Sequence, residues 1–371
     1  NSMSEKKTDS FFKEFISGRM PYIWYYSILF VVAFCGSFFY FYLRGRILDA
    51  GTNSIRQMLI AVTYISEFYR KILKSLFTDH RFILPMWDMS IGYGADILTT
   101  LHYYGLTDPL TMISCLSDSS HMPIMYCIIY ALKVYLSGIS FSVYTRHRGL
   151  NRFQTLMGAL IYSFCAFPMQ YGVTMMLFLT PMIYLPLILS GADRILEGKS
   201  ARMFIICLFL LGISNFYFLY MIILITIVYV IFNYFYRYKN RDLKAAFKTA
   251  GQFLLCGFTS ILLSSFILLP NILIMLNSSR LNGRSYVPFI YFLKYYVRYI
   301  YAFTGITEPM KWTILGYTPI CLIALIFLFR RKDFSLKLGL ISLILCTVSK
   351  VSSSMMAGCV SLNTTHWSSL T

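Results

Sequence analysis

The chain has 371 residues, of which 57% are hydrophobic and only 13% are charged. Soluble domains contain about 45–50% apolar and about 25% charged residues, so this composition excludes a soluble globular protein. The formal net charge is +18, but no basic face belongs to a soluble domain, so nucleic-acid binding is not indicated. Contact with anionic lipid headgroups is sufficient to account for the charge.

Hydrophobic runs of membrane-spanning length recur along the chain. They predict nine spans, at 22–43, 122–144, 154–170, 174–191, 203–214, 216–234, 250–275, 313–329 and 334–350. The fifth run is too short to cross a bilayer alone, so we expect a half-span that turns at Ser214 and Asn215, or one part of a broken helix. The predicted fold is an all-α, polytopic integral membrane domain over residues 1–350, followed by a polar tail at 351–371.

Lysine and arginine are concentrated in one set of short segments between the predicted spans. Of the 33 basic residues, 19 lie in the segments 6–19, 146–152, 194–202, 237–248 and 330–337. Because the cytoplasmic loops of membrane proteins are enriched in Lys and Arg, this bias predicts a cytoplasmic N-terminus. The two long loops, 44–121 and 276–311, are then expected on the outer face of the cell membrane.

The first of these loops carries much of the acidic chemistry of the chain. It contains seven of the 15 acidic residues, namely Asp49, Glu67, Asp79, Asp88, Asp96, Asp108 and Asp118. Residues 55–76 of the loop place apolar side chains at helical spacing and most charged ones on other faces. This pattern predicts an amphipathic helix that lies in the membrane interface.

Four basic residues lie among tyrosines in the second long loop: Arg280, Arg284, Lys294 and Arg298. Aromatic side chains at this level commonly anchor a protein in the interface. A basic cluster beside them can also bind the phosphate of a lipid. Both interpretations are open on the sequence alone.

Three further polar residues stand out because of their surroundings. Lys133 is charged and lies deep inside the second predicted span, so it is a candidate functional residue unless it snorkels to an interface. Asn215 lies where a span bends, and its amide can satisfy free backbone groups there. His102 is interpreted as an interface residue, with a role as proton shuttle as the alternative.

A series of short motifs runs through most of the chain in a specific order and spacing. The motifs are Asp49-Ala50-Gly51, Pro85-Met86-Trp87-Asp88, Gly92-Tyr93-Gly94-Ala95-Asp96, His102-Tyr103-Tyr104, Asp108-Pro109-Leu110 and Ser214-Asn215-Phe216-Tyr217. Together they resemble the bacterial YfhO family of membrane proteins, from the first span to about Lys350. This family is placed among the GT-C glycosyltransferases, which are polytopic and use sugars linked to lipid phosphates.

The resemblance implies a catalytic acid in the first outer loop, and Asp49 matches that position. Sugar transfer to a hydroxyl needs a carboxylate that accepts the proton or orients the acceptor. Asp88 and Asp96 are expected to support Asp49, with a divalent metal (Mg²⁺ or Mn²⁺) as one way in which the three carboxylates could act together. The basic residues of the second loop are the candidates for the carrier phosphate, where negative charge develops.

Each of these acids also has a purely structural interpretation. Asp49 can cap a helix that starts near Thr52, and Asp96 can cap a helix over residues 97–103. Asp88 can be an ordinary turn residue, and Asp108 with Pro109 can simply start a turn.

The predicted function is transfer of a sugar from a polyprenyl-phosphate carrier to a cell-envelope polymer, with lipoteichoic acid as the example that the resemblance implies. One alternative is a transporter or flippase of lipid-linked saccharides, which needs ionisable groups at mid-membrane. Another is a non-catalytic envelope assembly protein. Family members continue well beyond this length, so the resemblance also implies a C-terminally truncated chain.

Overall fold

The computed structural model describes residues 21–45, 53–165, 167–237 and 243–276, together with Phe327 and Arg330. These residues are mostly helical, and five helical segments are long and apolar enough to cross a membrane. The five segments are Tyr22–Leu43, Ser119–His147, Met176–Leu196, Phe216–Phe235 and Lys244–Leu263. The predicted class of multi-helix membrane protein is therefore confirmed, with five spans in the described part of the chain.

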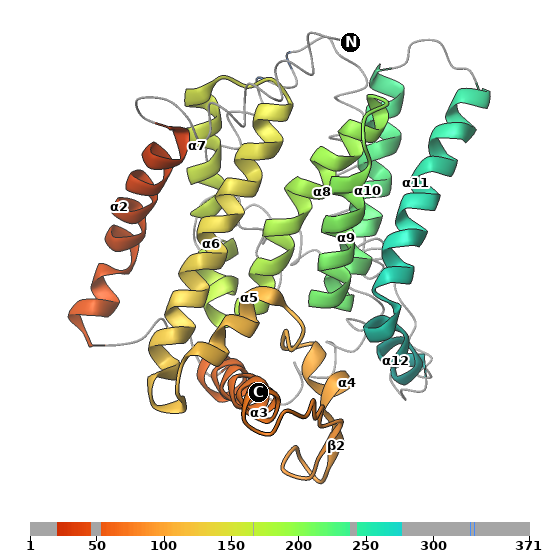
Figure 1. Cartoon of the computed structure of the whole chain (residues 1–371). Helices are drawn as coiled ribbons and strands as arrows, with labels where there is room; N and C mark the ends of the chain where they lie inside the picture. Colours follow the sequence, from red (N-terminus) through yellow and green to blue (C-terminus); the bar gives the residue numbers. More distant parts are fainter. Residues whose placement is uncertain are drawn as a thin grey trace, which may run out of the picture. The chain divides into compact units, whose positions relative to one another are not determined.

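The chain divides into two compact units, residues 1–190 and 191–371. The long helices of the first unit are α2 (Tyr22–Leu43), α6 (Met122–His147), α7 (Arg152–Ser163) and most of α8 (Thr180–Leu196) (Figure 1). The second unit contains α9 (Arg202–Ser214), α10 (Phe216–Arg237), α11 (Leu243–Leu263) and α12 (Ser265–Leu276).

Two of the predicted spans are broken in the structure. The run at 154–170 forms the 12-residue α7 and then the π-helical turn Phe167–Gly172, because Pro168 has no N–H with which to continue the helical hydrogen bonds. The run at 250–275 forms α11 and α12, which meet at Ser264. The fifth run forms the short helix α9, which ends at Ser214 as expected.

The remaining predicted segments lie outside the described residues. This holds for the spans at 313–329 and 334–350, apart from Phe327, for the second long loop at 276–311, apart from Leu276, and for the polar tail at 351–371.

The first unit has a polar seam between α2, α6 and α7. The hydroxyl of Tyr22 lies 2.8 Å from Ser142 Oγ, and the hydroxyl of Tyr26 lies 3.1 Å from Ser163 Oγ. Tyr26 also donates a hydrogen bond to the backbone oxygen of Tyr135 at 3.0 Å. Small residues commonly allow such close approach between helices in membranes, where hydrogen bonds also join neighbouring helices.

Gly138 on α6 leaves the space that this seam needs. A Cβ atom at this position would lie 2.0 Å from Tyr26 Oη and 2.3 Å from Ser163 Oγ. We expect Gly138→Ala to lower the free energy of unfolding by about 1–3 kcal/mol, because the added methyl group displaces both hydroxyls in a packed core. Gly36→Ala on α2 is the matched control, since nothing lies within 4 Å of its added Cβ. Equal thermal unfolding of the two variants in detergent would contradict this account.

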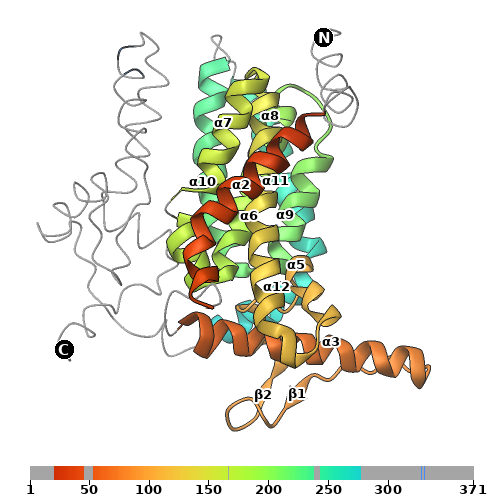
Figure 2. The same cartoon turned by 90° about the vertical axis from the view of Figure 1, so that its left-hand side faces the viewer.

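The first long loop, residues 44–121, folds into a layer of short elements. It contains the π-helical turn Ser54–Leu59, α3 (Ile60–Thr78), the strands β1 (Trp87–Asp88) and β2 (Ala95–Asp96), α4 (Ile97–His102), α5 (Pro109–Met112) and the 3₁₀ turns Ile113–Leu116 and Ser119–His121. Figure 2 shows α3 running crosswise to α6, at the end where α6 begins. The β1–β2 hairpin lies on the side of α3 away from α6 in both views.

The amphipathic helix predicted at 55–76 is present, but its apolar stripe packs against protein. Ile65, Phe68 and Ile72 of α3 are buried in a cluster with three apolar residues of the following segment, namely Ile97, Leu101 and Leu106. This face of α3 is therefore a packing surface of the loop, and the place of the helix in the membrane interface stays a prediction. Burial of about six apolar side chains gives the loop a small core of its own, which explains why this segment folds.

Candidate functional site

Asp88 is held in place by two hydrogen bonds at the start of the hairpin. The hydroxyl of Tyr64 on α3 donates to Oδ2 of Asp88, and the backbone N–H of Ser90 donates to Oδ1 at 2.8 Å. These bonds, with the Tyr64 bond as the larger cause, lower the pKa of Asp88 to about 2. Asp88 is therefore a partly exposed carboxylate that is ionised at neutral pH.

Asp96 is the N-cap residue of α4. Its Oδ2 accepts a hydrogen bond from the backbone N–H of Thr99 at 2.7 Å, as the structural interpretation predicts. Strand pairing places Asp96 opposite Trp87, and Asp88 opposite Ala95. The hairpin thus carries both carboxylates on neighbouring strands, although each already has a hydrogen-bond donor.

The three-carboxylate metal site is not assembled in the described part of the chain. No group of three or more His, Cys, Asp and Glu side chains there has the spacing of a metal site. Asp49, the predicted catalytic acid, lies outside the described residues. The same is true of the four predicted phosphate ligands, Arg280, Arg284, Lys294 and Arg298.

His102 lies in the interior of the first unit, and its place at the membrane interface stays a prediction. Its side chain is completely buried, and Nδ1 lies 3.0 Å from Thr107 Oγ1. Burial lowers the pKa of His102 to about 4, so the imidazole is neutral at pH 7.

Lys133 does not snorkel to an interface. Its Nζ lies 2.8 Å from Oδ2 of Asp108 and donates a hydrogen bond to Thr180 Oγ1 at 3.1 Å. Both charged side chains are only 1% exposed. The same Asp108 oxygen accepts hydrogen bonds from the backbone N–H and the hydroxyl of Thr111, so Asp108 also caps α5.

Asp108 and Thr180 are the partners that the sequence analysis did not find. A lysine inside a membrane span usually pairs with an acidic residue, so Lys133 itself indicates that such a partner exists elsewhere in the chain. In the sequence, Asp108 before Pro109 is fully explained as the start of a turn, so nothing local indicates a distant partner. The structure shows both roles in one side chain.

Asn215 satisfies backbone groups at a helix break, as predicted. It is 1% exposed, and its Oδ1 accepts hydrogen bonds from the backbone N–H groups of Tyr217 and Phe218 at 3.0 and 3.3 Å. These bonds cap the beginning of α10.

A second buried acid, Asp193, was not singled out in the sequence. It lies near the end of α8, is completely buried, and accepts a hydrogen bond from the Tyr229 hydroxyl at 2.9 Å. A tyrosine so far along the chain gives no signal of such pairing, because it depends on how the helices pack.

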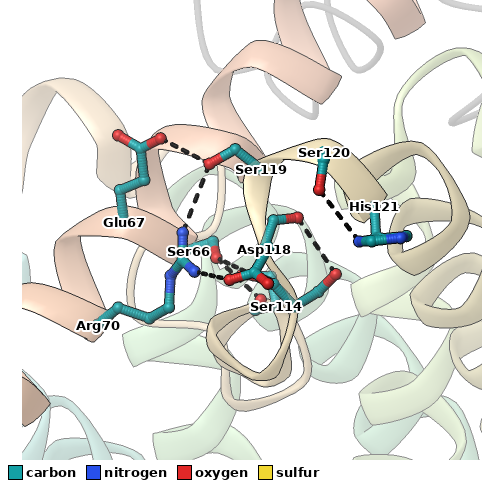
Figure 3. Close-up of polar contacts among 9 residues, drawn as sticks. Ser66, Glu67, Arg70, Ser114, Asp118, Ser119, Ser120 and His121 are labelled. Carbon is teal, nitrogen blue, oxygen red and sulfur yellow. Dashed lines mark hydrogen bonds and ion pairs between the residues drawn. The ribbon is translucent and has the colours of Figure 1, made fainter.

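A polar network ties α3 to the segment that precedes α6 (Figure 3). Arg70 forms an ion pair with Asp118, and Ser119 Oγ donates to Glu67 Oε1 at 2.8 Å. Ser66 Oγ lies within hydrogen-bond distance of two backbone oxygens of the loop, at 2.9 and 3.1 Å. The network links these two segments at the surface, where exposed charges contribute little to stability, whereas the Asp108–Lys133 pair lies in the interior.

These features define a multi-span membrane protein whose first long loop is folded against its helices and attached by a buried ion pair. Residues 29–357 match the family model described as "Bacterial membrane protein YfhO". The chain therefore belongs to the YfhO family, as the motifs predicted.

One curated relative extends this comparison. The chain is 22% identical over 250 residues to a Bacillus subtilis (strain 168) protein called "Uncharacterized protein YfhO". The aligned part covers 64% of this chain and 28% of the relative, so the chain matches less than a third of that protein's length. No solved structure matches the chain.

Proposed function

We propose that this membrane protein is a GT-C-type glycosyltransferase that moves a sugar from a polyprenyl-phosphate carrier to a cell-envelope polymer. The observation that carries the proposal is the folded first loop, whose β1–β2 hairpin carries the ionised carboxylate of Asp88 and lies beyond α3 at the end where α6 begins (Figure 2). Membership of the YfhO family and the motifs of this loop support the same function. A lipoteichoic acid-like polymer is the proposed acceptor.

The roles of the loop residues follow from the chemistry of transfer. Asp49 accepts the proton of the acceptor hydroxyl, as a general base must. Asp88, which stays ionised, orients the acceptor or adds negative charge near the oxocarbenium-like sugar. Asp96 acts indirectly, because its carboxylate caps α4 and fixes the second strand of the hairpin.

The cations belong at the leaving phosphate. Arg280, Arg284, Lys294 and Arg298 are proposed to bind the phosphate of the carrier, where negative charge increases as the glycosidic bond breaks. A divalent ion (Mg²⁺ or Mn²⁺) at Asp49, Asp88 and Asp96 is a second proposed source of positive charge at this phosphate.

The proposal requires both long loops on the outer face, with the N-terminus in the cytoplasm. In a variant without the nine native cysteines, a cysteine at Thr78 should react with an impermeant maleimide added to intact cells. One at Ser200, between α8 and α9, should react only after the cells are opened. Both positions are exposed in the structure. Labelling of the second position from outside would reverse the orientation and exclude an outer-face site.

The direct test uses the purified protein in lipid nanodiscs. Polyprenyl-phosphate glucose and polyprenyl-phosphate N-acetylglucosamine, each with a radiolabelled sugar, are supplied in parallel with a poly(glycerol phosphate) acceptor. We expect the label to move from one of the two donors to the polymer. Donors that remain intact with the acceptor present would contradict the transferase.

A transporter of lipid-linked saccharide is the second candidate, because the ion pair of Asp108 with Lys133 lies midway along a membrane helix. The purified protein, reconstituted into sealed vesicles with the same labelled donors, distinguishes the two functions. A transporter moves the labelled carrier between leaflets with its glycosidic bond unbroken, whereas a transferase breaks that bond. A non-catalytic assembly protein does neither.

A further inference from the structure

A buried ion pair joins three parts of the first unit that are far apart in sequence. Asp108 comes from the first loop, Lys133 from the middle of α6, and Thr180 from the first position of α8. Lys133 lies eleven residues beyond Met122, which is about 16 Å along the helix. The beginning of α5 therefore lies alongside α6 and not only against its end.

The pair is better suited to set a position than to add stability. Removing two charges from water costs free energy that their attraction often only balances. In addition, Oδ1 of Asp108 is buried and accepts no hydrogen bond from the described part of the chain. A core selected only for stability would contain apolar side chains here, as buried pairs can often be replaced by apolar residues without loss.

Position, in contrast, is strongly constrained by this arrangement. If α5 moved along α6 by one helical turn, about 5.4 Å, both charges would be buried without a partner. The cap of α5 moves with Asp108, because the same carboxylate binds Thr111. The observed placement of α5 satisfies all these contacts at once.

We propose that Asp108 and Lys133 are positioning residues, whose ion pair fixes where the α4–α5 part of the first loop docks on α6 and α8. The pair thereby sets the place of the carboxylate-bearing loop relative to the membrane helices. The docking role of the ion pair does not depend on the proposed transferase function. Only the purpose of the positioned loop, sugar transfer, rests on it.

The test compares Lys133→Met, Asp108→Asn and the double variant by hydrogen exchange and thermal unfolding in nanodiscs. Each single variant leaves one buried charge unpaired, so it should melt at a lower temperature and exchange amides in residues 97–116 at least about tenfold faster than wild type. The double variant contains no unpaired charge and keeps a capping oxygen at position 108. It should recover most of the melting temperature while residues 97–116 still exchange at least about tenfold faster.

The control is the exposed ion pair of the same loop, changed by Arg70→Met together with Asp118→Asn. This double variant should leave amide hydrogen exchange in residues 97–116 unchanged. Wild-type exchange in the single variants, or recovery of wild-type exchange in the double variant, would overturn the proposal. A double variant that melts as early as the single variants would also overturn it, since the pair would then stabilise the whole fold. Hydrogen exchange needs no substrate, so these results stand even if wild-type protein fails to transfer sugar.

Discussion

Asp49→Asn should abolish most sugar transfer while leaving the protein folded. Help from a general base is worth roughly 10²–10⁴-fold in rate, and an amide at this position cannot accept the acceptor's proton. Asparagine is as good a helix cap as aspartate, so a residue that only caps a helix would lose little by this change. We expect turnover to fall by at least about a hundredfold, measured as label transferred from a polyprenyl-phosphate sugar in nanodiscs.

The matched control is Asp79→Asn, which removes an exposed acid of the same loop at the end of α3. Its turnover should equal that of wild type. The two variants should have the same melting temperature within error, which shows that a lower transfer rate does not result from unfolding. Near-normal transfer by a well-folded Asp49→Asn variant would exclude Asp49 as the base and favour the capping role.

Removal of two cations from the second long loop should weaken donor binding strongly. A charged hydrogen bond to phosphate in a partly dry site is worth about 1.5–3 kcal/mol, or roughly ten- to a hundredfold in affinity. We expect Arg284→Ala with Arg298→Ala to raise the Kd for the polyprenyl-phosphate sugar by at least about tenfold. Binding is measured with labelled donor in nanodiscs made of neutral lipid.

A double variant of the first loop, Lys74→Ala with Arg81→Ala, removes the same charge from two exposed positions and serves as the control. If the second-loop cations only meet bulk headgroups, both double variants should show the same small, salt-sensitive change. Equal Kd values in the two variants would therefore remove Arg284 and Arg298 from the proposed phosphate site.

Hydropathy predicts the simple spans of this chain well. The runs at 22–43, 122–144 and 216–234 correspond closely to α2, α6 and α10. Each is a long apolar segment without proline beyond its first turn, so length alone determines the helix. Broken segments are less predictable, because hydropathy measures the polarity of side chains and does not register where a backbone hydrogen bond is missing. The apolar run through Pro168 continues while the helix does not.

Local polar roles are also predictable, whereas long-range pairs are not. The caps formed by Asp96 and Asn215 involve donors only two or three residues away, so the sequence contains the whole interaction. Lys133 was recognisable as unusual, but its partner lies 25 residues earlier, in a loop whose path depends on tertiary packing. The apolar stripe of α3 gives a similar lesson, since periodicity shows that a face is buried but does not show what buries it.

The short helices of the second unit have a consequence for the surrounding lipid. α9 has 13 residues and α12 has 12, which correspond to about 20 and 18 Å, against a hydrocarbon thickness of about 30 Å. The two helices contact each other, and apolar side chains such as Ile206 and Leu273 remain exposed on them. We expect lipid beside this pair to be thinner than beside the longer α11, because thinning is one response to a short apolar surface. The mismatch is local to α9 and α12, so a thinned patch of lipid is expected at this side of the second unit and not around its longer helices.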